Sequence, residues 1–84
     1  MNISSAIVYA MPGAVGAARA GIEAVAGVEV HAADDARLIV TIEADDDRAT
    51  ANIFESLGRI TGVASVAMIY NRLEADPEGE IAQA

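Results

Sequence analysis

The chain carries one pattern twice, and this repetition restricts its possible folds more than any other feature. Residues 22–32 (IEAVAGVEVHA) and residues 57–67 (LGRITGVASVA) each read as the end of a helix, then Gly-Val, then the start of a strand. A β-rich run precedes each helical segment. The order strand, helix, strand is therefore predicted twice within 84 residues.

The first half contains a strand and a weak helix. Residues 3–10 (ISSAIVYA) are typical of a strand, which ends at Met11-Pro12-Gly13. Residues 12–27 form an amphipathic helical pattern, with Pro12 suited to the first turn and Gly27 to the end. Its apolar positions are Val15, Ala18, Ile22 and Val25. Each internal glycine costs up to about 1 kcal/mol relative to alanine, so packing must hold this helix.

Two strands joined by a turn follow the first helix. Residues 27–33 predict a short edge strand, residues 33–37 (ADDAR) a turn, and residues 37–44 a longer strand. Residues 44–62 predict a second helix, in which the carboxylates of residues 45–47 cap the first turn. Its expected buried stripe is Ala49, Ile53, Leu57 and Ile60, with Phe54 beside it and Gly62 closing the helix. A last strand follows over residues 62–73.

This order predicts an α+β fold, the ferredoxin-like split βαββαβ arrangement. Two right-handed crossovers place both helices on one face of a four-stranded antiparallel sheet with strand order 4-1-3-2. We expect residues 1–73 to form the domain. Residues 74–84 (EADPEGEIAQA) are acidic and interrupted by Pro77 and Gly79, so we expect a disordered tail there.

Alternation along the strands assigns side chains to the two faces of the sheet. The residues expected to face the helices are Ala6, Val8, Val28, Val30, Leu38, Val40, Ile42, Val66, Met68 and Tyr70. The residues expected on the opposite face are Ser5, Ile7, Tyr9, Glu29, His31, Ile39, Thr41, Glu43, Ser65, Ala67 and Ile69. If Ile7, Ile39 and Ile69 lie level, they form an apolar stripe, which is typical of a partner site.

The charge balance restricts the kind of partner that the chain is expected to bind. The chain has 13 acidic residues and 5 basic ones, all arginine, for a net charge of −8. This charge disfavours nucleic-acid binding and favours a basic partner. No apolar run approaches the ~18 residues of a membrane span, and the N-terminal run lacks the positive start of a secretory signal. We therefore expect a soluble, cytoplasmic protein.

The sequence offers little for catalysis or metal binding. It has no cysteine, and its single histidine, His31, lies on the predicted edge strand. Ser4 and Ser5 have no evident base, and the acidic runs at 34–35 and 45–47 lack the spacing of a calcium loop. The loop after the first strand has no arginine for phosphate chemistry. We expect no enzyme activity, no cofactor and no metal.

Three segments together resemble the NapD family. They are residues 3–12 (ISSAIVYAMP), 27–46 (GVEVHAADDARLIVTIEADD) and 62–70 (GVASVAMIY), and the resemblance spans about residues 3–73. NapD proteins are small cytoplasmic chaperones for the catalytic subunit of periplasmic nitrate reductase. The resemblance implies a ferredoxin-like fold that binds the twin-arginine signal peptide of the reductase precursor, held in helical form on the sheet. It also implies that binding restrains export until the molybdenum cofactor and iron–sulfur cluster are installed.

With this resemblance, the open sheet face becomes the expected signal-peptide site. Its predicted binding residues are Ser5, Ile7, Tyr9, Ile39, Thr41, Glu43, Ser65, Ala67 and Ile69. Tyr9 departs from the family, since many relatives are expected to have histidine there. Two alternatives stay open: a small-molecule-binding regulatory module of the same fold, and a homo-oligomer in the form of a purely structural homodimer.

Overall fold

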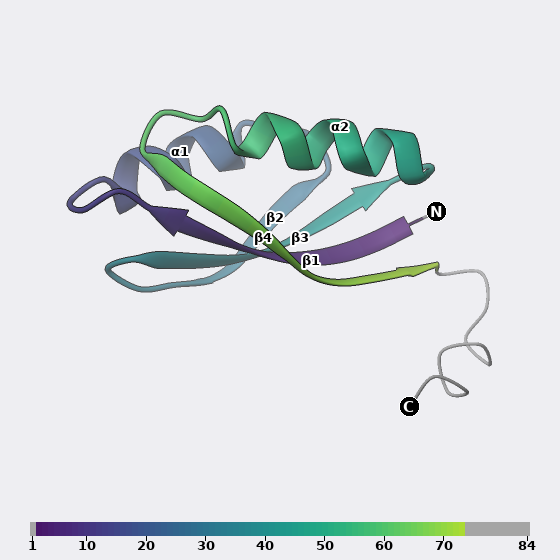
Figure 1. Ribbon diagram of the computed structural model, residues 1–84, viewed down its shortest axis with the longest axis horizontal. Coiled ribbons are helices and arrows are strands. Elements are labelled where there is room, and N and C mark those ends of the chain that lie inside the picture. Colours follow the sequence, from purple (N-terminus) through teal and green to yellow (C-terminus); the bar gives the residue numbers. More distant parts are fainter. Residues whose placement is uncertain (1, 74–84) are drawn as a thin grey trace.

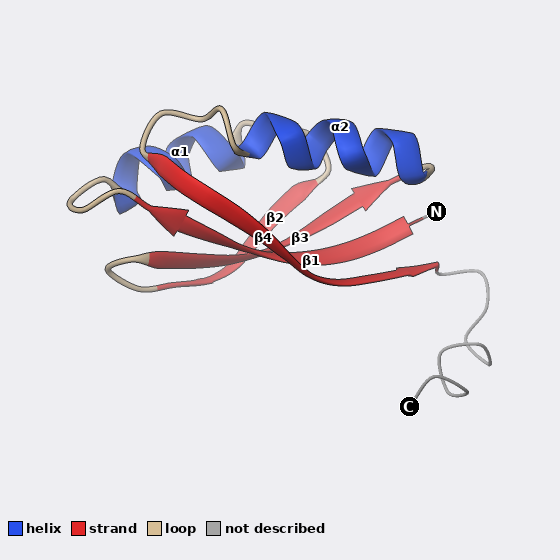
Figure 2. Cartoon of the chain, in the orientation of Figure 1, coloured by secondary structure: helices blue, strands red, loops and turns tan. Residues whose placement is uncertain are grey.

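The computed structural model describes the backbone of residues 2–73 and the side chains of residues 2–69. Its elements follow the order strand, helix, strand, strand, helix, strand (Figures 1 and 2). They are β1 (Asn2–Ala10), α1 (Val15–Glu23), β2 (Val28–Ala33), β3 (Arg37–Ala44), α2 (Asp47–Leu57) and β4 (Val63–Leu73). The predicted tail over residues 74–84 lies outside the described residues.

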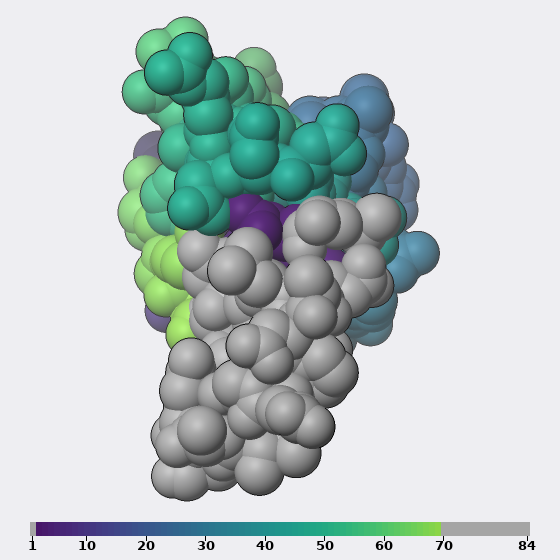
Figure 3. All heavy atoms as spheres, turned by 90° about the vertical axis from the view of Figure 1, so that its right-hand side faces the viewer, coloured from purple at the N-terminus to yellow at the C-terminus, as the bar shows by residue number. Residues whose placement is uncertain are grey.

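The four strands form one antiparallel sheet in the order β2-β3-β1-β4. This is the predicted order 4-1-3-2 read from the other edge. Both helices lie on the same side of the sheet (Figure 1), and Figure 3 shows α2 in teal stacked above the purple atoms of β1. The predicted ferredoxin-like fold is confirmed.

The core lies between the helices and one face of the sheet. Its fully buried members are Ala6, Val8, Ala18, Ile22, Leu38, Val40, Ile42 and Leu57. Val28, Val30 and Val66 are half-buried and pack against this cluster, as predicted. Met68, expected on the helix side, pairs with the buried Ala6 and borders a hollow between α2 and the edge strand β4, so 40% of its surface stays exposed. The side chain of Tyr70 lies outside the described residues.

Both helices are shorter than the sequence predicts. α1 begins at Val15, and Pro12 precedes it in a turn that the Ala14 N–H closes on the Met11 carbonyl. α2 ends at Leu57, so Ile60 lies in the following turns, where its side chain still packs against the core. The predicted cap is confirmed at the start of α2. There the Asp46 carboxylate accepts from the Ala49 N–H at 2.8 Å.

The repeated Gly-Val steps have a conformational reason. Gly27 and Gly62 both have positive φ, +86° and +93°, a region that residues with a Cβ rarely adopt. A Cβ at Gly27 would also lie 2.6 Å from the Glu43 carbonyl oxygen, and one at Gly62 would lie 3.0 Å from the Ala14 carbonyl oxygen. Each glycine thus lets the chain turn closely from a helical segment into a strand.

Candidate functional site: the open sheet face

The sheet face opposite the helices carries the predicted binding residues. Burial alternates along β1 and β3, so the side chains of one parity are buried and those of the other reach the open face. The open-face side chains of the three long strands are Ile3, Ser5, Ile7, Tyr9, Arg37, Ile39, Thr41, Glu43, Ser65, Ala67 and Ile69. All nine predicted site residues are among them, while their role in binding stays a prediction.

An apolar row crosses the middle of this face. Ile7 of β1 pairs with Ile39 of β3 on one side and with Ala67 of β4 on the other. Residues paired in this way have Cβ atoms roughly 4.5–5.5 Å apart, so their side chains form one continuous surface. Ile39 remains 36% exposed. The row therefore presents apolar surface that no described element covers.

The predicted row of three isoleucines is wrong for Ile69. Ser5 pairs with Tyr70 and Ala6 with Met68, so Ile69 is an extra residue in a β-bulge of β4. The bulge moves Ile69 out of line with Ile7 and gives that position in the row to Ala67. Ile69 is still 53% exposed and widens the apolar surface on the β4 side. A bulge leaves no clear mark in a single sequence, so alternation alone could not reveal this shift.

A polar group borders the apolar row on the β2 side. His31 Nε2 lies 2.8 Å from Thr41 Oγ1 and 3.3 Å from Glu29 Oε1. His31 is the extra residue of a second bulge, because Val30 pairs with Val40 while Ala32 pairs with Ile39. The sequence predicts no role for His31. The pairing register of β2 with β3, which the sequence alone does not reveal, places its imidazole beside Thr41, one of the predicted site residues.

Two shallow hollows mark opposite ends of β3 on the β2 side. One, of about 260 Å³, is lined by Gly27, Val28, Glu29, Thr41 and Glu43. The other, of about 300 Å³, is lined by Ala32, Ala33, Asp34, Arg37 and Ile39. The first contains two carboxylates, and the second is bordered by methyl groups and the β2–β3 turn.

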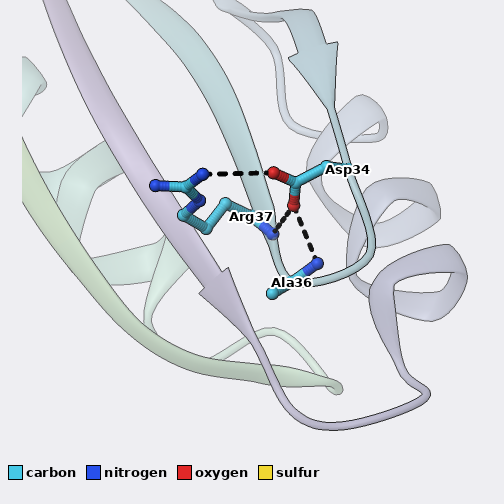
Figure 4. A network of polar contacts seen from close by, with 3 residues as sticks. All are labelled: Asp34, Ala36 and Arg37. Atoms are coloured by element: carbon cyan, nitrogen blue, oxygen red, sulfur yellow. Dashed lines mark hydrogen bonds and ion pairs between the residues drawn. The ribbon is translucent and has the colours of Figure 1, made fainter.

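The β2–β3 turn is fixed by one carboxylate. Asp34 Oδ1 accepts from the N–H groups of Ala36 and Arg37, both at 2.8 Å, and its Oδ2 lies 3.3 Å from the Arg37 guanidinium (Figure 4). The hydrogen bond from the Ala36 N–H, followed by those from Arg37, lowers the pKa of Asp34. These contacts balance the Asp34 charge locally, so this end of the face offers no free carboxylate at Asp34.

The described residues offer no cluster of side chains that indicates metal binding. Within residues 2–73, no group of three or more histidine, aspartate and glutamate side chains gathers as a metal site. No helix in this part of the chain has the length and apolar character needed to cross a membrane. The surface features that stand out are apolar, with carboxylates at one end. This arrangement is suited to noncovalent binding of another molecule.

Fold and face together define a small ferredoxin-like domain with one face of its sheet left uncovered by the described helices. The chain belongs to the NapD family, because the model of the family described as "NapD protein" matches residues 1–75. It is similar to the solution structure of the E. coli Tat proofreading chaperone protein NapD, with 28% sequence identity and a TM-score of 0.76. That match covers 90% of this chain and 82% of the E. coli chain. Comparison with curated proteins gives no match.

Proposed function

We propose that this protein is a chaperone that binds the twin-arginine signal peptide of the catalytic subunit of periplasmic nitrate reductase. It acts in the cytoplasm, restrains export of the precursor until cofactor loading is complete, and catalyses no reaction itself. The observation that carries the proposal is the open apolar row Ile39–Ile7–Ala67 in a chain of the NapD family. The similarity to a Tat proofreading chaperone supports it.

The face complements such a peptide in composition. A twin-arginine signal has a basic first region followed by an apolar segment, and the open face combines an apolar row with the exposed carboxylates of Glu29 and Glu43. The net charge of −8 favours encounter with a basic peptide. Charge therefore accelerates and orients binding, while the apolar row supplies contact area.

The energetics indicate that the whole face must take part. Burying a fully exposed isoleucine contributes about 1.5–3 kcal/mol, but Ile39 and Ile69 have only 36% and 53% of their surface left to bury. Each then contributes roughly 0.5–1.5 kcal/mol. Exposed ion pairs add about 0–1 kcal/mol each, and ordering a disordered peptide costs about 2–5 kcal/mol or more. We therefore expect Tyr9, Thr41 and Ser65 to contribute contacts as well.

Calorimetric titration with the signal peptide tests the proposal. The wild-type protein should bind, and Ile39→Glu should abolish binding while far-UV circular dichroism shows a folded domain, because Ile39 lies on the open face. Asn52→Glu is the matched control: it adds the same charge to the exposed surface of α2 and should leave binding unchanged.

Absence of binding heat at high micromolar wild-type protein and peptide would contradict the proposal. If Ile39→Glu unfolds the domain, Ile39→Thr replaces it, since threonine keeps the β-branched shape and loses apolar surface. Equal peptide affinity of the wild type and a folded Ile39 variant would show that the apolar row is not part of the binding site.

The small-molecule alternative has one observation in its favour. A mainly apolar hollow of about 470 Å³ lies between α2 and β4, with Phe54, Val66 and Met68 among its lining residues. If a ligand or a second copy fills this hollow, the amide shifts of Phe54 and Met68 should change, and those of the open face should not. Light scattering, with and without peptide, distinguishes self-association from peptide binding.

A further inference from the structure

The two ends of the open face differ in charge. At the end where β3 finishes, Glu29 and Glu43 border the hollow of about 260 Å³. At the end where β3 begins, Arg37 lies 3.3 Å from Asp34 and balances its charge. Two carboxylates, Glu29 and Glu43, thus lie at the end of β3, whereas the turn at the other end carries Asp35 beside the balanced Asp34–Arg37 pair.

Neither of the two carboxylates has an arginine partner among the side chains of residues 2–69. Glu29 lies 3.3 Å from the His31 imidazole, while the arginine ion pairs are Arg19–Glu23, Arg37–Asp34 and Arg59–Glu55. Guanidinium groups bind carboxylates through a planar set of donors. The end of β3 thus offers the carboxylates that a pair of peptide arginines would contact.

The apolar surface extends in the other direction. Beyond the polar Thr41, which lies between Glu43 and Ile39, it comprises the row of Ile39, Ile7 and Ala67, and then Tyr9, which is exposed at the end of β1. Met11 follows in the loop after β1 and is 50% exposed. The Ala10 N–H donates to the Ala36 carbonyl at 2.8 Å, so this loop lies beside the β2–β3 turn. The face therefore changes from acidic to apolar along one axis.

We propose that the signal peptide binds in a single direction along this axis. Its arginine pair contacts Glu29 and Glu43, and its apolar segment runs over the Ile39–Ile7–Ala67 row toward Tyr9 and the β2–β3 turn. Since the arginines precede the apolar segment, the peptide runs opposite to β3 and in the direction of β1. This inference rests on the proposed function and specifies the partner's orientation at the same site.

Chain geometry sets the spacing that the peptide must satisfy. Ile39 and Glu43 are four positions apart on β3, which corresponds to roughly 13 Å along a strand. A helix covers this length in about nine residues, at about 1.5 Å per residue. A helical peptide whose arginines contact Glu43 therefore places on the central row the apolar residues that lie about two and a half turns further along its chain.

Paramagnetic labelling tests the direction. The probe is a synthetic peptide with two adjacent arginines followed by an apolar segment, labelled with a nitroxide at either its N- or its C-terminus. The N-terminal label should broaden amide signals near Glu29 and Glu43, and the C-terminal label should broaden those of Tyr9, Met11 and Arg37. The reverse pattern, or equal broadening of both ends by each label, would overturn the inference and leave the proposed function intact.

Charge variants give a second readout of the same inference. Glu29→Gln and Glu43→Gln should each weaken binding about two- to fivefold, as expected for exposed ion pairs, and should do so less for a peptide with both arginines replaced by glutamine. Glu55→Gln, which removes a carboxylate on α2, is the matched control and should have no effect. If unlabelled peptide does not bind the wild type at all, the proposed function itself fails; equal effects on both peptides would overturn only the assigned arginine contacts.

Discussion

The two faces of one strand differ in what their apolar residues contact. On β3, Leu38, Val40 and Ile42 are fully buried under the helices. Ile39, between two of them, is 36% exposed on the opposite face. Ile39 and Ile42 have the same side chain and differ mainly in strand parity. Apolar residues of one parity hold the fold, and those of the other remain partly exposed on the face where we propose that the peptide binds.

The largest expected effect comes from shortening neighbouring side chains on the two faces. Leu38→Ala should lower the free energy of unfolding by about 2–5 kcal/mol, because it leaves a cavity in the core. In a domain of this size, that loss approaches the total stability of about 3–5 kcal/mol. Ile39→Ala should cost clearly less, since its site is partly open to water. Urea unfolding monitored by circular dichroism compares them; equal losses would mean that the two faces contribute alike to stability.

A smaller effect tests how tightly the covered face is packed. A Cβ at Gly21 of α1 would overlap the Ile60 side chain, whereas a Cβ at Gly16 would meet no atom within 4 Å. Gly21→Ala should therefore destabilise the protein by about 1–3 kcal/mol despite the better helix propensity of alanine. Gly16→Ala, the matched control, should stabilise it by up to about 1 kcal/mol. Thermal unfolding distinguishes them, and stabilisation by both would show that α1 can move away from Ile60.

The smallest effect concerns the turn at the edge of the open face. Since folding lowers the pKa of Asp34, its ionised form favours the folded state at pH values above the unfolded pKa of about 3.9. This contribution is lost as the pH falls through the lower folded-state pKa. The stability difference between wild type and Asp34→Asn should thus be constant near neutral pH and shrink below about pH 4.

Asp35→Asn provides the control for that titration, because it removes a neighbouring charge and leaves the hydrogen bonds of Asp34 in place. Urea unfolding at several pH values between neutral and strongly acidic gives the profile. A difference between wild type and Asp34→Asn that grows as the pH falls would contradict the assigned role of the carboxylate.

The sequence predicts the architecture well because each element has a local signal. Alternation in β3 distinguishes Leu38 from Ile39, Asp46 marks the start of α2, and the glycines at 27 and 62 mark the turns into strands. These signals depend on backbone geometry within a few residues. The element order, the strand order and the face of almost every described strand residue follow from them.

The structural features that the sequence does not predict depend on contacts between residues far apart in the chain. The position of Ile69 depends on a bulge opposite Ser5, and the contact of His31 with Thr41 depends on a bulge opposite β3. α2 ends at Leu57, earlier than predicted, because Ile60 packs against the core from the turns that follow the helix. Register and tertiary packing decide all three, and neither is visible in a single strand's pattern.

Residue-resolved NMR during titration with unlabelled signal peptide tests most directly whether the open face is the binding surface. We predict that amide shifts will change along β1 and β3, with their largest values around Ile7, Ile39 and Thr41. The amides of α1 and of the middle of α2 should stay unchanged. Changes confined to the helices, or to the hollow at Phe54 and Met68, would contradict peptide binding on the open sheet.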